Sequence, residues 1–321
     1  MAENSRTEVN DVSPSSLGHL IGQRSVVDQV RVALDSAQQD GTKFDHSLLV
    51  GPPGCGKTQT AKVIAAEMAN ALHELLGQSI SSPADFNSIL LAAKDGDIVF
   101  VDEAHELDKP YQTALFLALD QRKLVVGGGR SGRAVQSIPL SDFTLLLATT
   151  DEYGLLSPLL QRMKLTLRFD FYSVADLTTL LLQRSRALGW PVHEELLPRI
   201  AQRSRGTPRL ALRLLQSCRR CCRSEGESTI TAGHFLRACE LEQIDEIGLG
   251  PTEQQYLRAL SDGASRLNVI ASLLGLPART VAQVVEPFLL RSGLLVKDDN
   301  GRRELTAKGR EHLSNHPYNP V

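Results

Sequence analysis

The 321-residue sequence predicts an α/β fold in which a parallel sheet is followed by two smaller, mainly helical domains. Up to about residue 170, short apolar runs alternate with helical segments, as in buried parallel strands joined by helices. Beyond it the strand signal disappears and leucines recur at helical spacing. The C-terminal segment then shows three helical stretches followed by a strand–turn–strand pattern.

The first domain is expected to hold a nucleotide. Residues 51–58 read Gly-Pro-Pro-Gly-Cys-Gly-Lys-Thr, after the apolar run 48–50 and before a helical stretch, 59–68. A strand, a glycine-rich turn and a helix in this order are typical of a phosphate-binding P-loop, whose backbone N–H groups face the anion. Lys57 is expected to reach the β- and γ-phosphates, and the Thr58 hydroxyl to hold Mg²⁺. The pattern predicts a protein that binds a nucleoside triphosphate.

Two further strands end in polar residues. The run 98–101 leads into Asp102 and Glu103, and the run 145–148 leads into Thr150. In P-loop enzymes the first acid helps to hold Mg²⁺, and the second can polarise the attacking water. The threonine is expected between these groups and the γ-phosphate. A solvated strand end is the simpler alternative, and the spelling Asp-Glu-Ala-His at 102–105 is interpreted as coincidence.

Two arginines occupy positions that can reach a nucleotide. Arg162 follows Ser-Pro-Leu-Leu-Gln at 157–161, and Arg209 stands in the first turn of a helix that Thr207 and Pro208 begin. An arginine offered to the ATP of a neighbouring subunit stabilises charge in the transition state. The ordinary alternatives are a surface arginine at a helix end and a simple helix start.

The sequence is divided as follows: a disordered N-terminus at 1–16, an ATPase domain at 17–173, a helical domain at 174–247 and a winged-helix domain at 248–321. The last prediction rests on helices near 252–260, 267–274 and 278–291, then strands at 294–297 and 303–306 around a turn.

Composition is that of a globular protein, with 42% hydrophobic and 22% charged residues and a net charge of −2, which argues against a uniformly basic surface. No apolar run approaches the roughly 18 residues of a membrane helix, and the N-terminus has no apolar signal core. Five cysteines without framework spacing indicate free thiols. Together these features predict a cytoplasmic protein. Cys218 and Cys221 leave a zinc site open as an alternative to packing.

The motifs in this order resemble the bacterial RuvB family, AAA+ motors that drive branch migration of Holliday junctions. The resemblance covers roughly residues 12–314. It rests on the P-loop, the Asp-Glu strand, Ala-Thr-Thr at 148–150, Pro-Leu-Leu-Gln-Arg at 158–162, Gly-Thr-Pro-Arg at 206–209 and the winged helix.

The resemblance implies an AAA+ ATPase with a helical lid and a winged-helix domain. It implies ATP and Mg²⁺ as ligands, duplex or four-way-junction DNA as a partner, and a hexameric ring. Residues 124–138 match the hairpin by which the family binds its partner RuvA. Nucleotide positions carried over in this way are Ile21, Gly22, Gly54, Gly56, Lys57, Thr58, Gln59, Tyr172 and Arg209, with Thr58 and Asp102 toward the metal. Catalytic positions are Lys57, Asp102, Glu103, Thr150, Arg162 as the finger and Arg209 as the second sensor; Lys297 and Arg302 would contact DNA.

Departures from the family pattern indicate a divergent member. Ser13 and Asp151 stand where the family usually has arginine, and Met163 where it has phenylalanine. Asp298 and Asp299 add negative charge to the wing. Two other functions therefore remain open: a clamp-loader-like or protein-remodelling AAA+ ATPase, and a nucleotide-switched winged-helix regulator.

Overall fold

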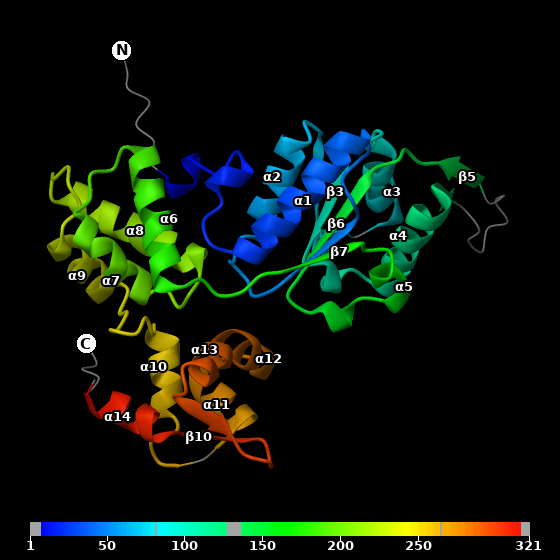
Figure 1. The fold of residues 1–321 in the computed structure, drawn as a ribbon. Coiled ribbons are helices and arrows are strands. Elements are labelled where there is room, and N and C mark those ends of the chain that lie inside the picture. Colours follow the sequence, from blue (N-terminus) through cyan, green and yellow to red (C-terminus); the bar gives the residue numbers. More distant parts are fainter. Residues whose placement is uncertain (1–7, 81, 127–135, 264, 316–321) are drawn as a thin grey trace. The chain divides into compact units, whose positions relative to one another are not determined.

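The computed structural model describes residues 8–80, 82–126, 136–263 and 265–315 (Figure 1). Its contacts form two compact units, Met1–Gly189 with Gly206–Arg213, and Trp190–Arg205 with Leu214–Val321. The domain boundaries drawn above near residues 173 and 247 stay a prediction.

The first unit is built on a five-stranded parallel sheet, which confirms the predicted α/β class. The strands lie in the order β2-β3-β6-β1-β7, and every neighbouring pair is parallel. They span Ser47–Val50 (β1), Leu72–Leu76 (β2), Ile98–Asp102 (β3), Thr144–Thr149 (β6) and Leu165–Arg168 (β7). Because the strands are parallel, the polar residues that follow β1, β3 and β6 meet at one edge of the sheet.

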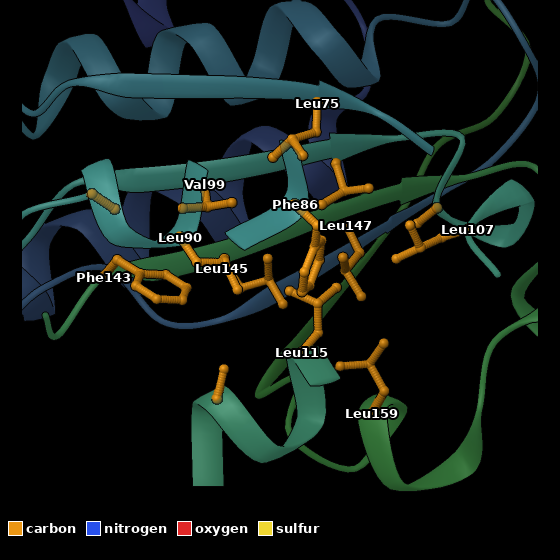
Figure 2. Packing of buried hydrophobic residues seen from close by; sticks show 14 of the residues in the cluster. Leu75, Phe86, Leu90, Val99, Leu107, Leu115, Phe143, Leu145, Leu147 and Leu159 are labelled. Atoms are coloured by element: carbon orange, nitrogen blue, oxygen red, sulfur yellow. The ribbon is translucent and has the colours of Figure 1, made fainter. Parts of the chain in front are cut away.

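Helices cover both faces of this sheet. On one face α1 (Arg24–Asp40) and α2 (Lys57–Glu67) pack against alternate residues such as Leu49 and Leu146. The other face carries α3 (Pro83–Ala92), α4 (Lys109–Gln121) and α5 (Ser157–Leu160). Figure 2 shows its core, in which Leu145 and Leu147 of β6 pack with Leu115 of α4 and Leu159 of α5. Strands buried on both faces are uniformly apolar, which explains the short runs seen in the sequence.

Helix ends follow local signals. Ser82 accepts a 3.2 Å hydrogen bond from the N–H of Asp85, and Pro83 follows it as the first residue of α3. Ser173 does the same for Asp176 at the start of α6 (Val174–Leu188). Gly189 then closes α6 with a φ of 66°, a left-handed conformation that glycine adopts without strain.

The N-terminal segment differs in part from the expected disorder. Val9–Asp11 forms a 3₁₀ turn (η1), and Val9 is buried. The Arg184 guanidinium donates a 2.6 Å hydrogen bond to the carbonyl of Val9. A contact with α6 that lies 175 residues away therefore orders this segment, and local composition cannot reveal it. A second 3₁₀ turn, Leu17–His19 (η2), follows.

The predicted hairpin at 124–138 is present at its base. β4 (Lys123–Val126) and β5 (Gln136–Pro139) are antiparallel, with Leu124 opposite Ile138. Residues 127–135, between these strands, lie outside the described residues.

The second unit holds the remaining lid helices and a winged helix. Its helices are α7 (Leu197–Gln202), most of α8 (Pro208–Ser224), α9 (Ala232–Leu241), α10 (Pro251–Arg258), α11 (Leu267–Leu274), α12 (Ala278–Thr280), α13 (Glu286–Arg291) and α14 (Ala307–Asn315). Its strands β8 (Ser265–Arg266), β9 (Leu295–Lys297) and β10 (Arg302–Leu305) form one sheet in the order β8-β10-β9. The remaining short 3₁₀ turns of the chain are Gly77–Ser79 (η3), Ala104–Glu106 (η4), Glu152–Gly154 (η5) and Glu194–Leu196 (η6).

The predicted third helix of the winged-helix segment contains a π-helical turn. Residues Val281–Val285 (η7) adopt this wider form between α12 and α13. Pro287 lies two residues after this turn, and a proline ring has no N–H and clashes with the carbonyl four residues earlier. A wider turn before the proline relieves that clash.

Among the described residues, no single helix has the length and apolar composition needed to cross a membrane. One pair, α11 with Ala278–Arg291, meets these criteria only when its two parts, bent by 105°, are counted together.

Candidate functional site

The glycine-rich turn joins β1 to α2 at the carboxyl edge of the sheet. Gly54 and Gly56 both have left-handed backbones, with φ of 75° and 102°. A Cβ added to Gly54 would lie 3.0 Å from Cβ of Arg209, so the backbone and the arginine approach more closely than other residues allow. The turn therefore presents backbone N–H groups at the start of α2, beside a guanidinium side chain. This is a cradle for phosphate.

Lys57 lies buried inside this turn. Its ammonium donates hydrogen bonds to the carbonyls of Gly51 at 2.7 Å and Pro52 at 3.1 Å. Burial lowers the pKa of Lys57, and the neighbouring carboxylates Glu103 and Asp102 act in the opposite direction. The ammonium is thus held at the turn by weak neutral acceptors, which a triphosphate can replace with charged oxygens.

Thr58 and Asp102 bring the turn and the acidic strand together. The Thr58 hydroxyl donates a 2.8 Å hydrogen bond to Asp102 Oδ2, and Asp102 Oδ1 accepts the N–H of Glu103 at 3.0 Å. One hydroxyl and one carboxylate converge at the mouth of the phosphate cradle. Mg²⁺ is held in proteins by one or two carboxylates together with waters and substrate phosphates, so this oxygen set fits it.

Glu103 has an unusual backbone. Its φ of 48° is left-handed, a conformation that is strained for a residue with a side chain. Its carboxylate Oε2 lies 3.5 Å from the Thr150 hydroxyl at the end of β6. The strand order places β6, which Thr150 follows, between β3 and β1.

His105, which was not selected from the sequence, contacts two residues of the site. Its Nδ1 lies 3.0 Å from the Thr149 hydroxyl and 3.5 Å from Glu103 Oε2. Thr149 already donates to the carbonyl of Asp151 and accepts that residue's N–H, so it accepts from His105. A protonated Nδ1 then links the end of β6 with Glu103. This residue ends the Asp-Glu-Ala-His segment, whose spelling was interpreted as coincidence.

An apolar pocket adjoins the glycine-rich turn within the first unit. Predicted residues Ile21, Gly56, Gln59 and Tyr172 line it. Residues that the sequence analysis did not select also contribute: Pro14, His19, Leu20, Gln23, Val26, Val27, Thr60, Leu180, Gln183, Arg184, Pro208 and Leu212. Such pockets beside a phosphate cradle suit a nucleobase.

Two details of this pocket fit a nucleoside. A Cβ on Gly22 would lie 2.8 Å from the Tyr172 ring, so glycine is required for the ring to close that side. Gln59 Oε1 is buried and has no hydrogen-bond partner among the described residues. A buried acceptor without a donor is unfavourable, and a bound nucleoside offers amino and hydroxyl donors. Burial also raises the pKa of Tyr172, which keeps its phenol neutral.

The side chain of Arg162 contacts α4. Arg162 follows α5, and its guanidinium forms an ion pair with Asp120 and lies 5.2 Å above the Phe116 ring, both on α4. Arg209, in contrast, lies against Gly54 in the same unit.

The positions that depart from the family pattern have local roles. Asp151 begins the turn Glu152–Gly154 by accepting the N–H of Tyr153 at 3.0 Å. Met163 is buried in the core on the α4 and α5 face of the sheet. Ser13 lines a hollow beside the nucleoside pocket together with Arg184.

In the winged-helix segment, Lys297 and Arg302 flank the turn of the wing. Lys297 Nζ lies 2.9 Å from Glu286 Oε2, and the fully buried Glu286 also accepts hydrogen bonds from Arg303 and Tyr256. Burial by itself raises the pKa of Glu286, but these three donors leave it below its ordinary value. The wing is thereby anchored to α13 through a charged network.

Asp298 stabilises the wing's turn. Its carboxylate accepts the N–H groups of Asn300 at 3.0 Å and Arg302 at 2.7 Å. From the sequence alone, Asp298 was expected only to weaken phosphate contact through its negative charge. Asp299 is exposed at the same turn.

One group of described residues brings three potential metal ligands within 4.8 Å of one another: Glu225, Glu227 and His234. His234 Nδ1 accepts the N–H of Thr231 at 3.0 Å, so the neutral ring carries its proton on Nε2, facing both carboxylates. A metal needs that nitrogen unprotonated, so the group is described better as a hydrogen-bonded helix start. The five cysteines are free and buried, and none belongs to this group.

Comparison with known proteins identifies the family. The model for the Holliday junction DNA helicase RuvB P-loop domain matches residues 12–169, that for the RuvB AAA lid domain 172–245, and that for the RuvB C-terminal winged helix domain 246–314. The Holliday junction branch migration complex subunit RuvB of Rubrobacter xylanophilus is 35% identical over 295 residues, covering 90% of this chain and 83% of that protein. Its counterpart in Mycolicibacterium gilvum is 37% identical over 310 residues, covering 95% and 86%.

Solved structures agree with these sequence matches. The Thermotoga maritima RuvB Holliday junction branch migration motor has a TM-score of 0.82 at 32% identity, covering 96% of this chain and 99% of that one. A single-residue variant of that protein has a TM-score of 0.84 at the same identity, covering 94% and 99%. The fold, the order of motifs and the matches over nearly the whole length lead to one conclusion: this chain belongs to the RuvB family.

Proposed function

We propose that this chain is a subunit of an ATP-driven DNA motor that promotes branch migration of Holliday junctions. The observation that carries the proposal is the convergence of Thr58, Asp102 and Glu103 at the phosphate cradle. Family membership supports the DNA substrate, because the related proteins are named for branch migration.

Each residue of the site has a chemical task in this proposal. Lys57 and the N–H groups that open α2 bind the β- and γ-phosphates. Glu103 accepts a proton from the attacking water, and Thr150 orients that water against the γ-phosphate. Thr58 and Asp102 would hold Mg²⁺, which would supply charge neutralisation on the phosphate oxygens. His105 keeps Glu103 and the end of β6 in register.

The nucleoside is held by Ile21, Gly22 and Tyr172 in the apolar pocket, where Gln59 accepts a hydrogen bond from it. Arg209 approaches the phosphates from the helical domain and senses them. Because Arg162 is turned onto α4, it serves the ATP of the next subunit. That role requires a closed ring, and we propose the family's hexamer around duplex DNA.

Lys297 and Arg302 on the wing contact the DNA backbone. The hairpin built on β4 and β5 is the proposed docking site for a partner of the RuvA type. The expected location is the cytoplasm, where chromosomal DNA is reached. Hydrolysis at one interface after another would move the duplex through the ring.

The proposal is tested by ATP hydrolysis measured with and without linear duplex DNA. A motor that tracks duplex hydrolyses ATP faster when DNA is added. Glu103→Gln should abolish this hydrolysis while ATP binding remains, since only the base is removed. An ATPase rate indifferent to DNA would instead favour a protein-remodelling AAA+ ATPase. DNA-regulated activity that Glu103→Gln leaves intact would favour a nucleotide-switched regulator.

A further inference from the structure

The guanidinium of Arg162 is held by two residues one helical turn apart on α4. Asp120 forms an ion pair with its Nη2, and the ring of Phe116 lies 5.2 Å from its central carbon. Residues four apart on a helix share one face, so the carboxylate and the ring form a single seat for the cation.

Part of the arginine side chain is also buried. Its Nε is buried and has no hydrogen-bond partner among the described residues. Helix α5, which precedes Arg162, packs on α4 in a core that contains the fully buried Leu159 and Leu115 (Figure 2). The backbone that carries Arg162 and the helix that carries its seat are therefore parts of one core.

This seat contributes little to folding. Both members of the ion pair are 41% exposed, and ion pairs in such positions add almost nothing to stability. They do restrict the rotamers of a long side chain, and an arginine placed in advance loses less freedom when it meets a phosphate. Asp120 contacts the planar guanidinium through Nη2.

We propose that Asp120 and Phe116 are positioning residues for the arginine finger: they act on the neighbouring subunit's ATP through Arg162. This inference rests on the proposed function, because it presumes that Arg162 works across a subunit interface. Asp120 should therefore affect ATP hydrolysis only when it is changed in the subunit that donates the finger. Changing it in the subunit whose ATP is hydrolysed should have no effect.

Mixed full-length subunits test this directly. Glu103→Gln subunits lack the base but keep the finger, whereas Arg162→Ala subunits lack the finger but keep the base. Mixing them should yield more ATP hydrolysis than the two preparations do separately, since each intact base meets a neighbour's intact finger. The rescued rate is the reference for every further variant.

Adding Asp120→Asn to the donor subunits should lower the rescued rate about tenfold with little change in KM for ATP, as expected for a misplaced catalytic group. Adding it to the Arg162→Ala subunits should leave the rescue unchanged. Phe116→Leu in the donor, which keeps apolar volume, should also lower the rescue. The matched control is Asp28→Asn in the donor, which removes another exposed ion pair, with Arg31, and should have no effect.

The outcomes distinguish failure of the positioning role from failure of the trans arginine finger. Equal rescue by donors with and without Asp120→Asn overturns the positioning role while the trans finger stands, and so does increased rescue. An equal loss from both sides of the interface also contradicts it, because a merely structural residue behaves that way. Absence of any rescue overturns the trans finger itself, and the positioning role with it.

Discussion

The hydroxyl of Thr58 donates a 2.8 Å hydrogen bond to the carboxylate of Asp102, a residue 44 positions further along the chain. This bond joins the first turn of α2 to the end of β3. It brings together the two oxygen donors that the sequence assigns to Mg²⁺.

Asp102→Asn should therefore weaken the response of ATP hydrolysis to Mg²⁺. The amide keeps the shape and can still accept from Thr58, but it removes the negative charge that attracts a hard cation. We expect a loss of roughly 10²-fold or more in kcat at saturating ATP, comparable to losing one charge-stabilising group. A Mg²⁺ titration of ATPase activity measures this. Thr113→Ala, on the exposed side of α4, is the control, and an unchanged titration curve would exclude Asp102 from the metal site.

Arg162→Ala should abolish ATP hydrolysis and leave ATP binding nearly intact. Arginine fingers contribute about 10³-fold or more to kcat. The side chain of Arg162 contacts α4 rather than the phosphate cradle of its own chain. Binding is measured with a fluorescent ATP analogue and hydrolysis by phosphate release. Arg31→Ala, an exposed arginine of α1, serves as the comparison. Lost ATP binding would place Arg162 in its own subunit's site instead.

Stability should fall as pH decreases from neutrality, through His46. Its Nδ1 accepts the N–H of Leu145 at 2.9 Å, and burial, followed by Lys43, lowers the pKa of His46 to about 4. Above pH 6.5 the ring is neutral in both the folded and the unfolded chain, so it does not lower the free energy of unfolding. Between 6.5 and about 4 the unfolded chain binds a proton that the folded chain does not, so stability is lost in that window.

The full loss is on the order of 3 kcal/mol at most. Urea unfolding of the wild type and of His46→Asn at pH 7 and pH 5 measures it, because asparagine can accept the same N–H without titrating. The variant should lose less stability over this interval, whereas His193→Asn, at an exposed position, should behave like the wild type. Equal losses in His46→Asn and the wild type would contradict the assignment.

Lys297→Ala and Arg302→Ala should each weaken binding to duplex DNA, whatever the base sequence of the DNA. Each should also reduce the slope of log affinity against log salt by about 1, since each phosphate contact releases about one counterion. Lys297→Ala leaves Glu286 bonded to Arg303 and Tyr256, so the wing should stay folded. Fluorescence anisotropy over a salt series measures both quantities, with Arg237→Ala of the helical domain as the control. An unchanged slope would remove the wing from the DNA contact.

Much of the site was predictable because its signals are local or follow from sheet topology. The residues 51–58 and the acids after β3 are contiguous motifs. Parallel strands then bring their carboxyl ends to one edge whatever the loops between them. The helix start at Pro208 was equally readable, because capping chemistry lies within a few residues.

Other features depend on which distant side chains meet. The contact of His105 with Thr149 spans 44 positions and exists only because β3 and β6 are neighbours. The carbonyl of Val9 accepts a hydrogen bond from Arg184 of α6, 175 positions away. Asp298 was assigned by its charge, while its backbone hydrogen bonds fold the wing's turn. Sequence spacing cannot reveal such pairings.

The central claim is tested most directly by branch migration of a labelled synthetic four-way junction, with and without a RuvA-type protein. Glu103→Gln subunits are the matched control. The account predicts ATP-dependent conversion of the junction to duplex products by the wild type and none by the variant. A wild-type protein that hydrolyses ATP on DNA yet leaves the junction unconverted under both conditions would contradict it.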